Sequence, residues 1–199
     1  SKRFLYSSGI HCPLIVRIPE KYKDFWPAEK PGMTVDRMVS FVDMPKTWIS
    51  LAGGEIPENY QGTIFLGKDI ESEPKYHFGF RGRADECYDS SRVMRGKRYS
   101  YHKNYAPFVP NGQFLPYMHN MIATPAWNKL HMEGKTNAVT GRFFRPRPSE
   151  EFYDNEVDFD NVNNLIDAPE HQEKIAELRA AMRAQMVKTY DTGLMPENM

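Results

Sequence analysis

The first apolar run along the chain predicts a buried strand close to its start. Residues 13–18 read Pro-Leu-Ile-Val-Arg-Ile and are closed by Pro19. A short apolar run rich in β-branched residues is typical of a strand buried on both faces of a mostly parallel sheet. The polar segment before it, residues 1–9, is rich in turn formers and ends in a glycine. We therefore expect a loop at a strand end, where open α/β sheets bind their ligands.

Three later stretches predict helices. Residues 43–52 form a short amphipathic helix with Asp43 as the expected N-cap, and Gly53-Gly54 ends it. Residues 121–133 form a second helix that stops at Gly134, and a third follows Pro169. The apolar positions expected to be buried are Met44, Trp48, Leu51 and Ala52 in the first helix and Ile175, Leu178, Met182 and Met186 in the last.

Alternating patterns between these helices predict a small antiparallel sheet. Residues 75–81 alternate between aromatic and other side chains, as a strand with two different faces does. Residues 91–95 and 98–102 indicate a hairpin whose turn is Gly96-Lys97. Residues 149–154 begin an acidic stretch that we interpret as a structural strand and turn.

Charge excludes some partners and singles out one region. The 26 basic and 26 acidic side chains cancel, so no whole-chain field indicates a nucleic acid or a membrane surface as partner. No apolar run approaches the ~20 residues that a membrane span needs. Between residues 75 and 103, however, eight cations face three acidic residues, an excess of about +5 (8 − 3). Either the polar face of a sheet lies in water there, or these cations hold an anionic substrate; the cations are Lys75, Arg81, Arg83, Arg92, Arg95, Lys97, Arg98 and Lys103.

The two cysteines are too few for a disulfide framework or a zinc cluster. Cys12 abuts the expected buried strand, so we expect it to be a core thiol. Lys2 lies in the expected ligand-binding loop and is either a solvated charge or an anion contact. The six histidines show no helical metal pair.

Four motifs, in order, resemble the type I, formylglycine-dependent sulfatases. The first is Lys2-(x3)-Tyr6-(x2)-Gly9-(x3)-Pro13, and the second is the helix that begins Val42-Asp43-x-Pro45. The third runs from Arg81 to Pro107 and is similar to a sulfamidase-like branch that acts on sulfated sugars. The fourth is the acidic ending, residues 150–170, with Glu-Phe-Tyr-Asp and Asn-Asn-Leu.

This resemblance implies an alkaline-phosphatase-like α/β sulfatase fold, of which the chain is the C-terminal part, with a small antiparallel sheet and a packed C-terminal helix. Residues 1–90 would end the large domain, and residues 91–199 would form the small C-terminal subdomain. The rest of the enzyme would be its N-terminal part, and the family places such enzymes in the periplasm or outside the cell.

The resemblance also implies the chemistry: hydrolysis of sulfate esters or N-sulfates of a sulfated carbohydrate. The formylglycine nucleophile and the Ca²⁺ ion would be supplied by residues upstream, because neither cysteine lies in a Cys-x-Pro/Ala-x-Arg motif. Lys2 matches the residue that contacts the sulfate group. Further candidates for substrate binding are Arg83, Asp85, Glu86 and His102, and we expect no metal ligand in this chain. Asp85 and Glu86 could equally form salt bridges with Arg83 and Arg92.

Two other functions stay open. The chain could be a non-catalytic fragment that binds sulfated glycans through the cations of residues 75–103. Alternatively, the enzyme could be a hydrolase of the same superfamily that acts on phosphate or phosphonate esters.

Overall fold

The computed structural model describes residues 3–84 and 87–193 and contains two compact units. We call the first the sheet unit; it combines Ser1–Cys12 with Phe78–Met199. The second unit is Pro13–His77. The boundary that we expect at residue 90 refers to the domains of a longer enzyme and stays a prediction.

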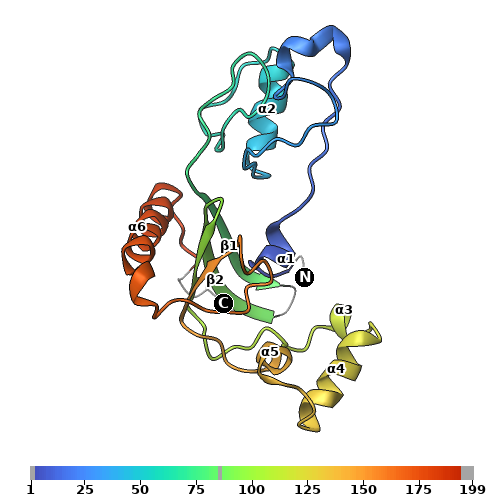
Figure 1. The fold of residues 1–199 in the computed structure, drawn as a ribbon, viewed down its shortest axis with the longest axis vertical. Helices are drawn as coiled ribbons and strands as arrows, with labels where there is room; N and C mark the ends of the chain where they lie inside the picture. The colour runs from blue at the N-terminus through green and yellow to red at the C-terminus, as the bar shows by residue number, and fades with distance from the viewer. Residues whose placement is uncertain (1–2, 85–86, 194–199) are drawn as a thin grey trace. The chain divides into compact units, whose positions relative to one another are not determined.

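A four-stranded sheet in the order β1-β2-β3-β4 forms the centre of the sheet unit (Figure 1). β2 pairs antiparallel with β3, and β3 with β4. Gly96 closes the turn between β2 and β3 by donating its N–H to the carbonyl of Tyr99 (2.8 Å). The expected hairpin and small antiparallel sheet are therefore confirmed. The strands are β1 (His77–Ala84), β2 (Cys87–Arg95), β3 (Tyr99–Asn104) and β4 (Glu150–Asp154).

One face of this sheet packs against the C-terminal helix α6 (Gln172–Lys188), which Figure 1 shows in red beside the strands. The register places Met94, Tyr101 and Phe152 side by side on one face. All three are buried, as are Ile175, Leu178 and Met182 of α6. Burial of each such side chain contributes about 1.5–3 kcal/mol. The predicted amphipathic C-terminal helix is confirmed.

The other face of the sheet is unusual because it is both buried and polar. Its side chains alternate with those that face α6, and most are hydrophilic although they are less than 6% exposed. The short helix α1 (Ser7–Ile10) and the residues before it belong to the same unit, and the ring of Tyr6 stacks on that of His102 (5.3 Å). The buried residues of this face are Ser91, Val93, Ser100, His102, Asn104, Glu151 and Tyr153.

Short helices fill the connection between β3 and β4. The helix predicted for residues 121–133 is observed as α4, and Leu115 and Met118 form a small core with Cys87. The remaining elements of this unit are α3 (Pro116–His119), α4 (Ala123–Met132), α5 (Ala138–Gly141) and the 3₁₀ helices η2 (Arg142–Phe144) and η3 (Pro169–His171).

The second unit contains the 3₁₀ helix η1 (Glu20–Phe25) and the helix α2 (Asp43–Leu51). The predicted helix is confirmed, but its details differ. Val42 is the N-cap, and the Asp43 carboxylate accepts hydrogen bonds from the N–H groups of Ser40 (2.7 Å) and Thr63 (2.8 Å). The buried residues of α2 are Asp43, Thr47 and Ser50, whereas Trp48 of the expected apolar face is 43% exposed.

The strand predicted for residues 13–18 is not observed. These residues lie outside any helix or strand, and Ile15 is 93% exposed. Cys12, predicted to be a core thiol, is exposed as well. A buried parallel strand needs hydrogen-bonded neighbours on both sides. None of the strands in the described part of the chain pairs with this segment.

Candidate functional site

The buried polar face of the sheet and the N-terminal segment over it enclose a small hollow, which is our candidate site. Its free volume is about 10 Å³, close to the space that a single water molecule needs. Buried polar side chains are far more informative than buried apolar ones, because each must be satisfied or serve a purpose. The hollow is lined by Phe4, Leu5, Tyr6, Arg81, Asp89, Ser91, His102, Asn104, Asn111 and Arg147.

Glu151 of β4 fixes Tyr6 on this face. The Tyr6 hydroxyl lies 3.1 Å from both carboxylate oxygens of Glu151, which is 2% exposed. The same carboxylate accepts hydrogen bonds from the hydroxyl of Tyr153 and from Nδ2 of Asn104 (2.6 Å). Three neutral donors thus satisfy a buried carboxylate, and one of them comes from the N-terminal segment.

Ser7 provides a second attachment. Its N–H donates to Oδ1 of Asn161 (2.8 Å), and its hydroxyl donates to Oδ1 of Asn155 (3.1 Å) and accepts from Nη1 of Arg95 (2.7 Å). Asn161 is fully buried and has a left-handed backbone conformation (φ +54°), which asparagine tolerates better than most residues. Tyr6 and Ser7 are therefore tied to residues about 150 positions later in the chain.

Burial determines the protonation states on this face. Burial and the neighbouring charge of Glu151 raise the pKa of Tyr6, so its hydroxyl stays a hydrogen-bond donor. Burial, aided by the positive charge of Arg95, lowers the pKa of His102 to about 3. His102 is therefore a neutral ring at physiological pH.

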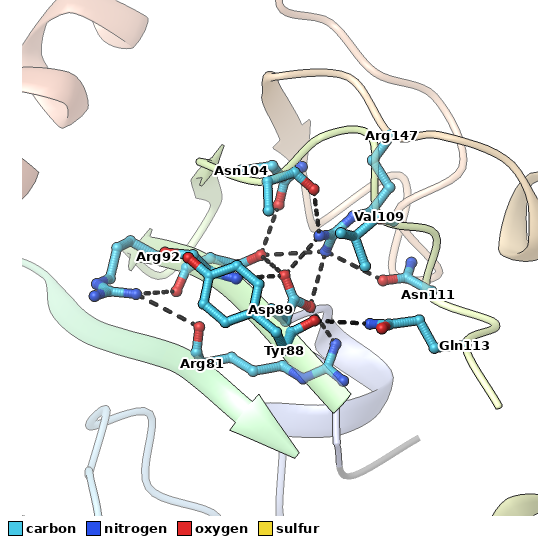
Figure 2. Close-up of polar contacts among 12 residues, drawn as sticks. Arg81, Tyr88, Asp89, Arg92, Asn104, Val109, Asn111, Gln113 and Arg147 are labelled. Atoms are coloured by element: carbon cyan, nitrogen blue, oxygen red, sulfur yellow. Dashed lines mark hydrogen bonds and ion pairs between the residues drawn. The ribbon is translucent and has the colours of Figure 1, made fainter. Parts of the chain in front are cut away.

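Two arginines share one carboxylate at the edge of the hollow (Figure 2). Asp89 of β2 is fully buried and pairs with Arg81 of β1 and with Arg147, whose Nη2 lies 2.6 Å from Asp89 Oδ1. Arg147 also donates to the carbonyls of Val109 (2.9 Å) and Ala106 (3.2 Å). In contrast, Nε and Nη2 of Arg81 are buried and have no hydrogen-bond partner among the described residues.

The local excess of cations does not form an open basic patch, because the fold pairs these residues internally. Arg92 pairs with Asp191, which follows α6, and Arg98 pairs with Asp154 (2.7 Å). Lys103 lies 3.4 Å from Glu150. The interpretation of this region as a set of cations free to hold an anionic substrate therefore loses support.

The residues proposed from the sequence are not brought together in the described part of the chain. Lys2, Asp85 and Glu86 lie outside the described residues. Arg83 is exposed on β1, whereas His102 lies buried at the hollow. Their roles in substrate binding stay predictions.

Sequence reasoning missed the part that Arg81, Asp89, Arg147 and Glu151 play at the hollow. The available signal was that they occur within the regions that resemble sulfatases or next to them. Nothing in the local pattern indicated that they would meet.

No cluster of three or more histidine, cysteine, aspartate or glutamate side chains in residues 3–84 and 87–193 has the arrangement of a metal site. The helices in these ranges are also too short or too polar to cross a membrane. The described residues therefore provide no set of ligands for the Ca²⁺ ion that the resemblance implies.

The fold is that of the C-terminal part of a sulfatase. The structure of a 2-O GAG sulfatase matches with a TM-score of 0.54 and 21% identity, over 84% of this chain and 28% of that one. The family description "N-sulphoglucosamine sulphohydrolase, C-terminal" matches residues 1–105, and the chain belongs to this family. The expected family and fold class are thereby confirmed.

Two curated relatives are each described as an ulvan-active sulfatase of Formosa agariphila (strain DSM 15362 / KCTC 12365 / LMG 23005 / KMM 3901 / M-2Alg 35-1). One is 34% identical over 99% of this chain and 32% of its own length. The other is 27% identical over 89% of this chain and 34% of its own length. The chain therefore spans about a third of the curated relatives that it matches.

Proposed function

We propose that the chain is the C-terminal part of a sulfatase that hydrolyses sulfate esters or N-sulfates of a sulfated carbohydrate. The main support is the relative described as an ulvan-active sulfatase, which is 34% identical over almost the whole chain. Within this proposal, Lys2 contacts the sulfate group. A positive side chain there would stabilise the negative charge of the reacting oxygens in the transition state.

The nucleophile and the metal belong to other residues in this proposal. A formylglycine would attack sulfur, and Ca²⁺ would offset the charge of the sulfate group. The described residues contribute by holding the segment that follows Lys2. Tyr6 is fixed by Glu151, and Ser7 is fixed by Asn155 and Asn161. A segment fixed at two successive residues is suited to the close positioning that catalysis requires.

The test is a sulfate-release assay of the complete protein with ulvan and with a glucosamine sulfate as separate substrates. We expect Lys2→Ala to lower turnover about 100-fold or more, as the loss of one contact to a developing oxyanion does. Lys2→Arg should retain much of the activity because it keeps a cation. Lys188→Ala, at an exposed position near the end of α6, is the matched control and should be neutral. Near-normal turnover of Lys2→Ala would contradict the proposed role of Lys2.

Two additional measurements separate the other functions. Hydrolysis of a phosphate or phosphonate ester, added as a further substrate, without sulfate release from the sulfated substrates would favour a phosphate or phosphonate ester hydrolase. Salt-sensitive binding of sulfated glycans without any release would favour a non-catalytic binding fragment. The internal pairing of Arg92, Arg98 and Lys103 argues against that last alternative.

The proposed setting is the periplasm or the outside of the cell, with the N-terminal part of the same enzyme as the partner of this chain.

A further inference from the structure

Arg81 is a buried cation with unused hydrogen-bonding capacity. Its side chain is 6% exposed, and a single nitrogen, Nη1, bonds to Asp89. Nε and Nη2 are shielded from solvent and meet no acceptor among the described residues. A buried donor without a partner costs about 1–3 kcal/mol, and more when it carries charge. Native proteins therefore rarely leave such a donor without a partner, and a bound ion or water is a common partner for a donor that has none in the protein.

The charges around the hollow favour an anion over water. The charged residues of the lining are Arg81, Arg147 and Asp89. Directly behind the lining, Glu151 acts on Tyr6 and Arg95 acts on His102, so the net charge is +1 (3 − 2). His102 adds no charge there, because its pKa is about 3. Burial also lowers the pKa of Arg81, and the positive charge of Arg147 adds to this effect against the attraction of Asp89. An anion at Nε and Nη2 would balance the positive charge that is left over because Arg81 and Arg147 share one carboxylate.

The small free volume favours a small anion. A free volume of about 10 Å³ is too small for a sulfate or a carboxylate group. The ring of Phe4 covers the guanidinium of Arg81, with 4.6 Å between them, and closes one side with an apolar surface. Weakly hydrated halides suit such a place better than strongly hydrated anions.

We propose that this hollow is a binding site for a monatomic anion, with chloride as the natural ligand. The anion completes the hydrogen bonding of Arg81 and so stabilises the contact between the N-terminal segment and the sheet. This proposal does not depend on the enzymatic activity, since the effect of the anion is on stability.

Thermal unfolding of the complete protein tests this site at constant ionic strength, with sodium chloride or sodium bromide exchanged for sodium gluconate. Gluconate is too large for the hollow. At a halide concentration about ten times Kd, the folding equilibrium constant rises about elevenfold. Tm in chloride and in bromide is therefore higher than in gluconate. Equal Tm values in the three salts would overturn the proposal.

Arg81→Lys should remove the halide dependence, because lysine keeps the charge beside Asp89 but lacks the paired donors. Arg92→Lys is the matched control: Arg92 is equally buried, but its Nε, Nη1 and Nη2 all have acceptors. It should lose stability and keep the halide dependence. Should Arg81→Lys fail to fold, crystals of the unmodified protein in bromide decide the question. An anomalous bromine peak beside Arg81 supports the site, and a water or an empty hollow refutes it.

Discussion

The replacement of Glu151 by Gln is the most direct test of how the N-terminal segment is held. Glutamine has almost the same shape as glutamate but has no charge and one fewer acceptor oxygen. In the native protein the carboxylate of Glu151 accepts from Tyr6, Tyr153 and Asn104. Glu151, Tyr153 and Asn104 are buried and Tyr6 is half-buried, so solvent replaces little of what is lost.

The expected loss of stability follows from these three hydrogen-bond donors. A hydrogen bond to a charged group contributes about 1.5–3 kcal/mol, and one between neutral groups contributes about 0.5–1.5 kcal/mol. The amide oxygen of Gln can retain two of the three donors, now as neutral bonds. The third donor must turn away or accept instead. Part of this loss is offset because an amide costs less to bury than a carboxylate. We expect Glu151→Gln to destabilise the protein by about 2–3 kcal/mol and Tyr6→Phe by about 1–2 kcal/mol.

Urea unfolding of the two single variants and the double variant measures their coupling. Because Tyr6 and Glu151 bond directly, we expect a coupling energy of about 1 kcal/mol or more. Glu156→Gln is the control, since Glu156 is 62% exposed and its substitution should be nearly neutral. If segment position matters for catalysis, both single variants also lower turnover. Additive effects within about 0.3 kcal/mol would refute the reasoning.

Two further predictions concern His102 and Gly62. His102 has a pKa of about 3 in the folded protein, below its ordinary value of about 6.5. Between these two pH values the unfolded chain binds one more proton than the folded chain. The free energy of unfolding therefore falls as pH falls, by up to about 1.4 kcal/mol per pH unit. His102→Phe should flatten this dependence in urea unfolding at pH 7 and pH 5, and equal slopes would contradict the buried neutral state. At Gly62 (φ +87°) a Cβ atom would lie 2.5 Å from the carbonyl oxygen of Val42, so Gly62→Ala should cost about 2–4 kcal/mol. Gly32 has a similar φ of +83°, but a Cβ atom there would meet open space. Calorimetry should therefore show a smaller loss of stability for Gly32→Ala. Equal losses for the two variants would show that backbone strain alone determines the cost.

The elements that could be predicted are those whose signals are local. The helix at residues 43–51, the hairpin around Gly96 and the C-terminal helix each carry their stop signals and periodicity within a few residues. The prediction for residues 13–18 is wrong because composition alone suggested burial. Burial depends on neighbouring strands, and the sequence pattern of one segment contains no information about them.

The candidate site illustrates a second limit. The excess of cations between residues 75 and 103 indicated an anion-binding surface, but their partners Asp154 and Asp191 lie far along the chain. Charge counted along a sequence window includes only neighbours in the chain. In the folded protein, ion pairs with these distant carboxylates balance most of the apparent excess of positive charge.

The first and last of the four sulfatase-like motifs are one physical unit. Tyr6 of the first motif bonds to Glu151 of the last, and Ser7 bonds to Asn161. Polar networks in a buried setting are stable only when every member is satisfied, so loss of either motif leaves the other with buried, unpaired groups. It follows that the two motifs should be retained or lost together. The C-terminal strand β4 would then serve the chemistry at a distance, by fixing the segment in which Lys2 lies.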